Sequence, residues 1–136
     1  MFNRIRVIAA AAVCAIVLTP ISLYAEPQEF IGKWSGTWSG VNPGDRPVLP
    51  SDLHVNSVDG NGVASGTYAW GNAPQWGVSA GSFDYKRGQV RDDTLQIDAG
   101  NNIIFKFVLN GDETIAGSRL VNGKPNGMVR MKKAGR

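Results

Sequence analysis

The chain has 136 residues, a formal net charge of +3, 17 glycines, one cysteine and one histidine. This length allows one small hydrophobic core rather than two. The single cysteine, Cys14, excludes an internal disulfide and thiolate zinc sites, and the single histidine, His54, leaves too few ligands for the usual zinc sites. The sequence therefore predicts a domain held together by packing and strand pairing, with no metal and no cofactor.

Residues 1–25 have the layout of a secretory signal peptide. Arg4 and Arg6 precede an apolar run from Val7 to Leu18, and Ala25 is a small residue suited to cleavage. The run is shorter than the roughly 20 residues that span a bilayer. We expect a periplasmic or secreted protein, with an uncleaved membrane anchor as the alternative. Removal of Arg4 and Arg6 would lower the net charge to about +1, so the charge gives no reason to expect nucleic-acid binding.

Residues 26–136 predict a single all-β domain, because short alternating segments are separated by turn signals roughly every 8–12 residues. Val41–Ser51 is expected to be a Pro/Gly loop, and Asp59-Gly60-Asn61-Gly62 is the strongest hairpin signal. The expected strands are Lys33–Gly40, Leu53–Val58, Val63–Trp70, Ser79–Lys86, Thr94–Asp98, Ile103–Leu109, Thr114–Leu120 and Gly127–Lys133.

Tight turns between successive strands predict an antiparallel, up-and-down order. Eight such strands avoid exposed edges by closing into a barrel, whose interior has room for side chains or one small ligand. A two-sheet β-sandwich is the alternative. A membrane-spanning barrel would need longer strands with an apolar outer face, whereas the second faces of these strands are polar, at Lys33, Ser35, His54 and Lys106.

Short tryptophan motifs near the start of the domain carry a family resemblance. The first strand opens with Gly32-Lys33-Trp34, after Phe30-Ile31, which fits a short turn of 3₁₀ helix. Gly36-Thr37-Trp38 is followed, after a strand and a glycine-rich turn, by Gly66-Thr67-Tyr68. Together with the strand order, these motifs resemble the calycin superfamily of small barrels, which includes lipocalins and avidins.

The calycin resemblance implies a plug at one end of the barrel and a small apolar ligand inside it. Trp34 would close that end under a basic residue of the last strand, where Arg130 and Lys132 are available and Arg130 is the residue that we expect. Biotin is not implied, because avidins cage it with tryptophans from later strands and this chain has none after Trp76.

Aromatic side chains are the candidates for a ligand site. Trp70 and Trp76 flank a Gly/Pro loop, and loops on a rigid scaffold commonly carry binding; a loop folded as a lid is the alternative. The other candidates lie on strands, where core packing is the alternative role. The full candidate set is Trp38, Tyr68, Trp70, Trp76, Tyr85 and Phe105.

The sequence contains no arrangement typical of an active site. Asp92-Asp93 is explained by turn chemistry, and His54 has no acidic or serine partner at a supporting spacing. We predict a non-enzymatic exported barrel that binds a small apolar or amphipathic molecule. One alternative is a protein-interaction module, like the small eight-stranded periplasmic inhibitors of secreted proteases, using the arm Glu26–Phe30 and the loop Val41–Ser51. A barrel enzyme with polar groups that the sequence does not single out is another.

Overall fold

A computed structural model describes residues 26–135; residues 1–25 and Arg136 lie outside the described part, and with them the predicted signal peptide and Cys14. The described chain contains two single-turn 3₁₀ helices and eight strands. No helix within it has the length and apolar character needed to cross a membrane. The elements are η1 (Pro27–Phe30), β1 (Gly32–Trp38), β2 (Leu49–Val58), β3 (Val63–Trp70), η2 (Pro74–Trp76), β4 (Gly81–Arg91), β5 (Thr94–Gly100), β6 (Ile103–Leu109), β7 (Thr114–Val121) and β8 (Lys124–Gly135).

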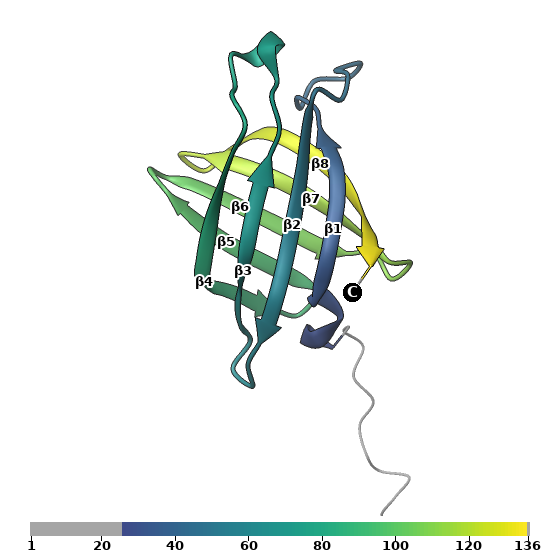
Figure 1. Ribbon diagram of the computed structural model, residues 1–136, viewed down its shortest axis with the longest axis vertical. Coiled ribbons are helices and arrows are strands. Elements are labelled where there is room, and N and C mark those ends of the chain that lie inside the picture. The colour runs from purple at the N-terminus through teal and green to yellow at the C-terminus, as the bar shows by residue number, and fades with distance from the viewer. Residues whose placement is uncertain (1–25, 136) are drawn as a thin grey trace, which may run out of the picture.

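The eight strands form a closed antiparallel barrel in simple up-and-down order (Figure 1). Each strand pairs with the next, and β8 pairs with β1 through Gly36 opposite Met131 and Trp34 opposite Lys133. Closure gives every strand two neighbours, although β4 pairs with β5 at only three residues, Gln89, Val90 and Arg91. The predicted barrel is confirmed, and the sandwich alternative is wrong.

Two strands, β3 and β6, begin and end where the sequence predicted, but β2 and β8 begin earlier. Each includes a proline that we expected to lie outside a strand. Pro50 pairs with Thr37 near one end of β2, and Pro125 pairs with Leu120 beside an irregularity in the β7–β8 register. A proline lacks the backbone N–H of a strand residue, and it is tolerated at such ends and bulges.

Alternation along the strands fills the barrel with apolar side chains. On β1, Trp34, Gly36 and Trp38 share the inner face, as predicted. Gly36 leaves room between the two tryptophans, because a Cβ there would lie 2.9 Å from Met131 Cγ and 3.0 Å from Val129 Cγ2. The side chains of β8 therefore pack across the middle of β1, between the two indoles.

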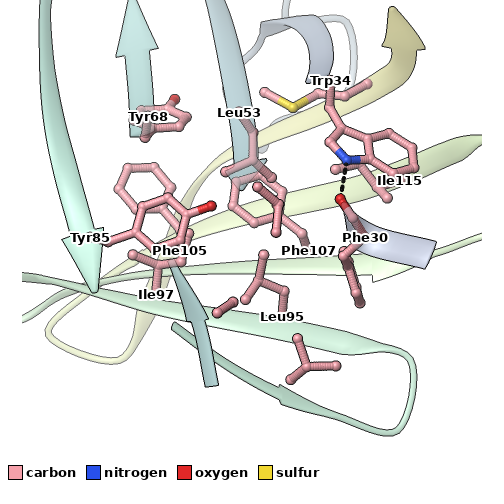
Figure 2. Packing of buried hydrophobic residues seen from close by; sticks show 14 of the residues in the cluster. Phe30, Trp34, Leu53, Tyr68, Tyr85, Leu95, Ile97, Phe105, Phe107 and Ile115 are labelled. Carbon is pink, nitrogen blue, oxygen red and sulfur yellow. Dashed lines mark hydrogen bonds between the residues drawn. The ribbon is translucent and has the colours of Figure 1, made fainter. Parts of the chain in front are cut away.

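The barrel has two different ends. We call the end with η1 and the turns at residues 59–62, 92–93 and 110–113 the closed end, and the opposite end, with the loops at residues 39–48 and 71–80, the mouth (Figure 1). At the closed end Trp34 Nε1 donates a 2.8 Å hydrogen bond to the Phe30 carbonyl of η1 (Figure 2). Phe30 and Trp34 are both fully buried, so the chain seals this end with its own residues.

The basic residue over the Trp34 ring is Lys133, which corrects the prediction of Arg130. Lys133 Nζ lies 5.1 Å from the Trp34 ring centroid and donates a hydrogen bond to the Glu29 carbonyl. Alternation on β8 explains the difference: Val129 and Met131 face inward, so Arg130 faces solvent. By the same alternation Lys133 lies on the inner face of β8, and it stands opposite Trp34 in the β1–β8 register.

Candidate functional site

The mouth contains a pocket of about 770 Å³. Six of its 17 lining residues are aromatic, and these six side chains come from β1, β3, β4, β6 and the β3–β4 loop. Aliphatic residues and a few polar residues complete the lining. The aromatic members are Trp38, Tyr68, Trp70, Trp76, Phe83 and Phe105, and the polar side chains are Asp45, Arg46, Arg119 and Asn126.

Tyr68 lies at the centre of the aromatic wall. Its ring centroid is 4.8 Å from that of Phe105, 5.5 Å from that of Phe83 and 5.9 Å from that of Trp70. Trp38 meets Phe105 edge to face at 5.8 Å. These tilted and edge-on arrangements are the ones that aromatic rings favour, so the wall is a packed unit rather than a set of separate side chains.

The aromatic side chains become more exposed from the base of the pocket to its rim. Trp38 is 2% exposed and Tyr68 and Phe105 are also buried, whereas Trp70 and Phe83 are half-buried. Trp76, on η2, is 42% exposed. The pocket thus has a buried apolar base and an open aromatic rim.

The β3–β4 loop, residues 71–80, carries the rim and has its own hydrogen bonds. Ala73 and Val78 exchange two backbone hydrogen bonds of 2.9 and 3.0 Å, and the Ala80 N–H donates to Asn72 Oδ1. Trp70 Nε1 donates to the Ser79 carbonyl at 2.9 Å, and this fixes the indole at the base of the loop. The rim is therefore held by hydrogen bonds within the loop and to Trp70.

Trp70 also rests on the backbone of Gly81. A Cβ at Gly81 would lie 2.6 Å from Trp70 Cζ2, closer than real Cβ contacts occur. Glycine at this position lets the indole lie flat against the start of β4. The position of the Trp70 ring thus requires a glycine at residue 81.

Hydrogen-bond donors lie behind the apolar surface of the pocket. The Tyr68 hydroxyl donates to Ser51 Oγ at 3.0 Å, with both residues buried. Burial raises the pKa of Tyr68, and the hydrogen bond with Ser51, the nearby Trp38 indole and the charge of Arg119 partly offset the rise. Trp38 Nε1 is buried near that hydroxyl but makes no hydrogen bond of good geometry with any described residue.

Arg119 is the lining cation whose charge acts on Tyr68 at the pocket base. It stands opposite the buried Phe105 in the β6–β7 register, so its side chain starts on the inner face of the barrel. Arg119 is half-buried, and Nη1 donates to Asn126 Oδ1 at 3.0 Å. Arg46 and Asp45 lie further out, both exposed, on the β1–β2 loop.

Five of the six predicted site residues line this pocket, and Tyr85 does not. Tyr85 pairs with Gly66, two residues further from the mouth than Tyr68, and its hydroxyl donates a 2.8 Å hydrogen bond to the His54 carbonyl. Burial raises the pKa of Tyr85. Tyr85 is thus a core residue with a satisfied hydroxyl, as the packing alternative described.

Sequence reasoning missed the two arginines of the lining, Arg46 and Arg119. A signal for Arg119 was present, because Ile115 is an inward position of β7 and alternation places residue 119 on the same face. A second hollow, of about 640 Å³, lies at the closed end beside Trp34 and His54. Across residues 26–135 no three histidine, cysteine, aspartate or glutamate side chains gather as a metal site.

Comparisons with known proteins add no functional assignment to this geometry. No protein-family model matches the chain, and no curated protein or solved structure matches it. The site is therefore characterised by its own residues alone. It is a pocket lined by six aromatic side chains at one end of a closed barrel.

Proposed function

We propose that this protein is an exported, calycin-like, non-enzymatic barrel that binds a small apolar or amphipathic molecule in the mouth pocket. The observation that carries the proposal is the pocket itself, about 770 Å³ in volume and walled by six aromatic side chains. Ligand sites in proteins typically have volumes of about 300–1,000 Å³, with apolar walls and a few polar groups that fix orientation.

Binding would be driven by burial of ligand surface against the aromatic wall. Each square ångström of apolar surface removed from water contributes about 25 cal/mol. The gradient of exposure from Trp38 to Trp76 suits a ligand whose apolar part enters first. Because the β3–β4 loop is already hydrogen-bonded, little ordering would be required when the ligand arrives.

Two further features support the calycin-like part of the proposal. The barrel is closed with eight strands in up-and-down order, and a 3₁₀ turn precedes β1. Trp34 lies under a cation of the last strand, although that cation is Lys133. Export is proposed on the signal-like sequence of residues 1–25.

The protein-interaction alternative receives less support. Its first contact element, the arm Glu26–Phe30, is tied into the closed end, where Phe30 is fully buried and the Glu29 carbonyl accepts from Lys133. Its second element, the Val41–Ser51 loop, is exposed from Val41 to Pro47 and borders the pocket through Asp45 and Arg46. This loop would be the contact surface of an interaction protein.

Intrinsic tryptophan fluorescence tests the proposal. Titration with a panel of apolar and amphipathic molecules is expected to quench or shift the emission, because three of the four tryptophans line the pocket. Trp34→Phe, at the closed end, should keep the signal, whereas Trp70→Phe and Trp76→Phe should reduce it. The absence of both a fluorescence change and a calorimetric signal with every member would contradict the proposal.

A further inference from the structure

We propose that the mouth pocket selects an amphipathic anion, whose acidic group is bound by Arg119 while its apolar body lies against the aromatic wall. This inference rests on the proposed function, since it concerns the same pocket. Beyond that function, the ligand is anionic and Arg119 recognises its charge.

Arg119 occupies an inward position of the barrel wall. It pairs with Phe105 on one side and with Gly127 on the other, so its side chain starts among inward positions of the barrel wall. Such positions are normally apolar, because a buried charge without a partner is costly. The half-buried Arg119 at such a position places a positive charge beside the aromatic wall.

Arg119 has hydrogen-bond donors beyond the one that it gives to Asn126. Its hydrogen-bond partner is the neutral side-chain oxygen of Asn126, and no carboxylate in residues 26–134 forms an ion pair with it. A guanidinium has five N–H donors in a planar fork that matches an acidic group of the carboxylate type. Arg119 can therefore bind an anion without breaking an internal salt bridge.

The polar groups behind the aromatic wall are hydrogen-bond donors. Trp38 Nε1 is a buried donor without a partner, and Tyr68 is a donor already engaged with Ser51. The charge of Arg119 reaches the Tyr68 hydroxyl, which places the cation within electrostatic range of the aromatic wall. The pocket thus has a positive charge next to aromatic rings, and further donors lie buried behind those rings.

The remaining charges of the lining agree with an anionic ligand. Arg46 adds a second positive charge at the rim, and Asp45 is the lone carboxylate among the lining residues. Asp45 is exposed and accepts a hydrogen bond from the Asn42 N–H, which turns it toward its own loop. A cationic ligand would meet two arginines, and a neutral one would leave Arg119 uncompensated.

A pair of fluorescent probes tests the inference. Anilinonaphthalene sulfonate and phenylnaphthylamine share one ring skeleton and differ by the sulfonate. We expect the purified protein to bind the sulfonate about tenfold more tightly, the gain of a charge-assisted hydrogen-bond pair. Arg119→Gln should abolish the difference, and Arg119→Lys should keep part of it. Arg130→Gln, the same charge change on the outer face of β8, should leave it unchanged.

Ionic strength provides a readout that needs no variant. Raising the salt concentration should weaken binding of the sulfonate and leave that of phenylnaphthylamine nearly constant. Equal affinity for the two probes, or a preference that survives Arg119→Gln, would overturn the anion inference while the binding pocket stands. Failure of both probes to bind would count against the pocket as a ligand site and would remove the inference with it.

Discussion

The two ends of the barrel use the same residue type in opposite ways. Trp34 and Trp38 lie four residues apart on the inner face of β1, and both are buried. Trp34 Nε1 has an acceptor in the Phe30 carbonyl and its ring lies beside Lys133, whereas Trp38 Nε1 has no acceptor among the residues described. One indole completes a packed end, and the other lines a pocket with an unused donor.

The closed end is covered by a segment of the chain, and the mouth has no equivalent cover among the described residues. The η1 turn folds under the barrel and contributes a buried phenylalanine and a backbone acceptor. At the mouth the corresponding space is bordered by two loops, with Trp76 at its rim. Identical side chains on one strand therefore differ in role because of what the neighbouring segments bring to them. Stability should depend on the closed end, and binding on the mouth.

Trp34→Ala should have the largest effect on stability. Removing a fully buried tryptophan leaves a cavity and an unpaired carbonyl, and such substitutions cost about 3–5 kcal/mol. Chemical denaturation measures the loss. Trp34→Phe should lose less, because it keeps most of the packing. A loss below about 1 kcal/mol for Trp34→Ala would contradict the plug role of this residue.

Gly81→Ala should perturb the mouth and its binding more than it perturbs the fold. The new Cβ would collide with Trp70 Cζ2, so the indole must move, at an expected cost of about 1–2 kcal/mol in unfolding free energy. Probe affinity should fall as well, because the ring lines the pocket. Gly60→Ala is the matched control at the closed end, where a Cβ would meet no atom within 4 Å.

Tyr85→Phe should cost about 1 kcal/mol at neutral pH, because the hydrogen bond to the His54 carbonyl is lost. Burial raises the pKa of Tyr85 above its value in the unfolded chain, so its contribution is complete below about pH 10 and is lost as the pH rises further. The variant should therefore lose less stability than the wild type under alkaline conditions.

Tyr68→Phe tests the same dependence of stability on alkaline pH at the mouth of the barrel. The pKa of Tyr68 is also raised by burial, but Ser51, Trp38 and Arg119 oppose the rise. Thermal unfolding followed from pH 8 to about pH 11 should show a smaller benefit for Tyr68→Phe than for Tyr85→Phe. An equal benefit would mean that the polar surroundings of Tyr68 do not act on its hydroxyl.

The sequence was sufficient for the architecture and for five of the residues that line the mouth pocket. Alternation and turn chemistry predicted the strands, and tryptophans beside a Gly/Pro loop indicated the end of the barrel where the pocket lies. Tyr85 shows the limit of this reasoning. It has the same inward parity as Phe83, yet Phe83 lines the pocket and Tyr85, paired with Gly66 one step deeper, does not. Depth depends on strand tilt and register across the barrel, which one sequence does not contain.

The charged residues show a second limit. Arg130 was chosen for the plug because it lies on the last strand, and Lys133 fills the role because of its inward parity and its register with Trp34. Arg119 was missed because two expectations conflict. Alternation along β7 places residue 119 on the inner face, whereas arginine side chains are usually exposed to solvent. Arg119 is thus a charged residue at an inward position, and the proposed anion site depends on it.

Lys133→Ala should have a smaller effect than the loss of a core residue. The half-buried ammonium contacts the Trp34 ring and the Glu29 carbonyl, and such a cation–π contact contributes about 0.5–1 kcal/mol. Lys132→Ala, one residue away on the exposed face of β8, should leave the unfolding free energy nearly unchanged. Equal losses for the two variants would indicate a general charge effect rather than a contact with the plug.

Trp76→Ala should change stability least and still weaken binding. The side chain is 42% exposed, so truncation should alter the unfolding free energy by no more than about 0.5 kcal/mol. Met128→Ala, at a site 52% exposed on the outer surface, is the control for loss of an exposed apolar side chain. If the loop takes part in binding, probe affinity should fall about fivefold for Trp76→Ala and stay constant for Met128→Ala. If the loop is only a lid over the barrel, stability should fall and affinity should hold; that result would move the binding surface away from the rim and toward Trp38 and Arg119.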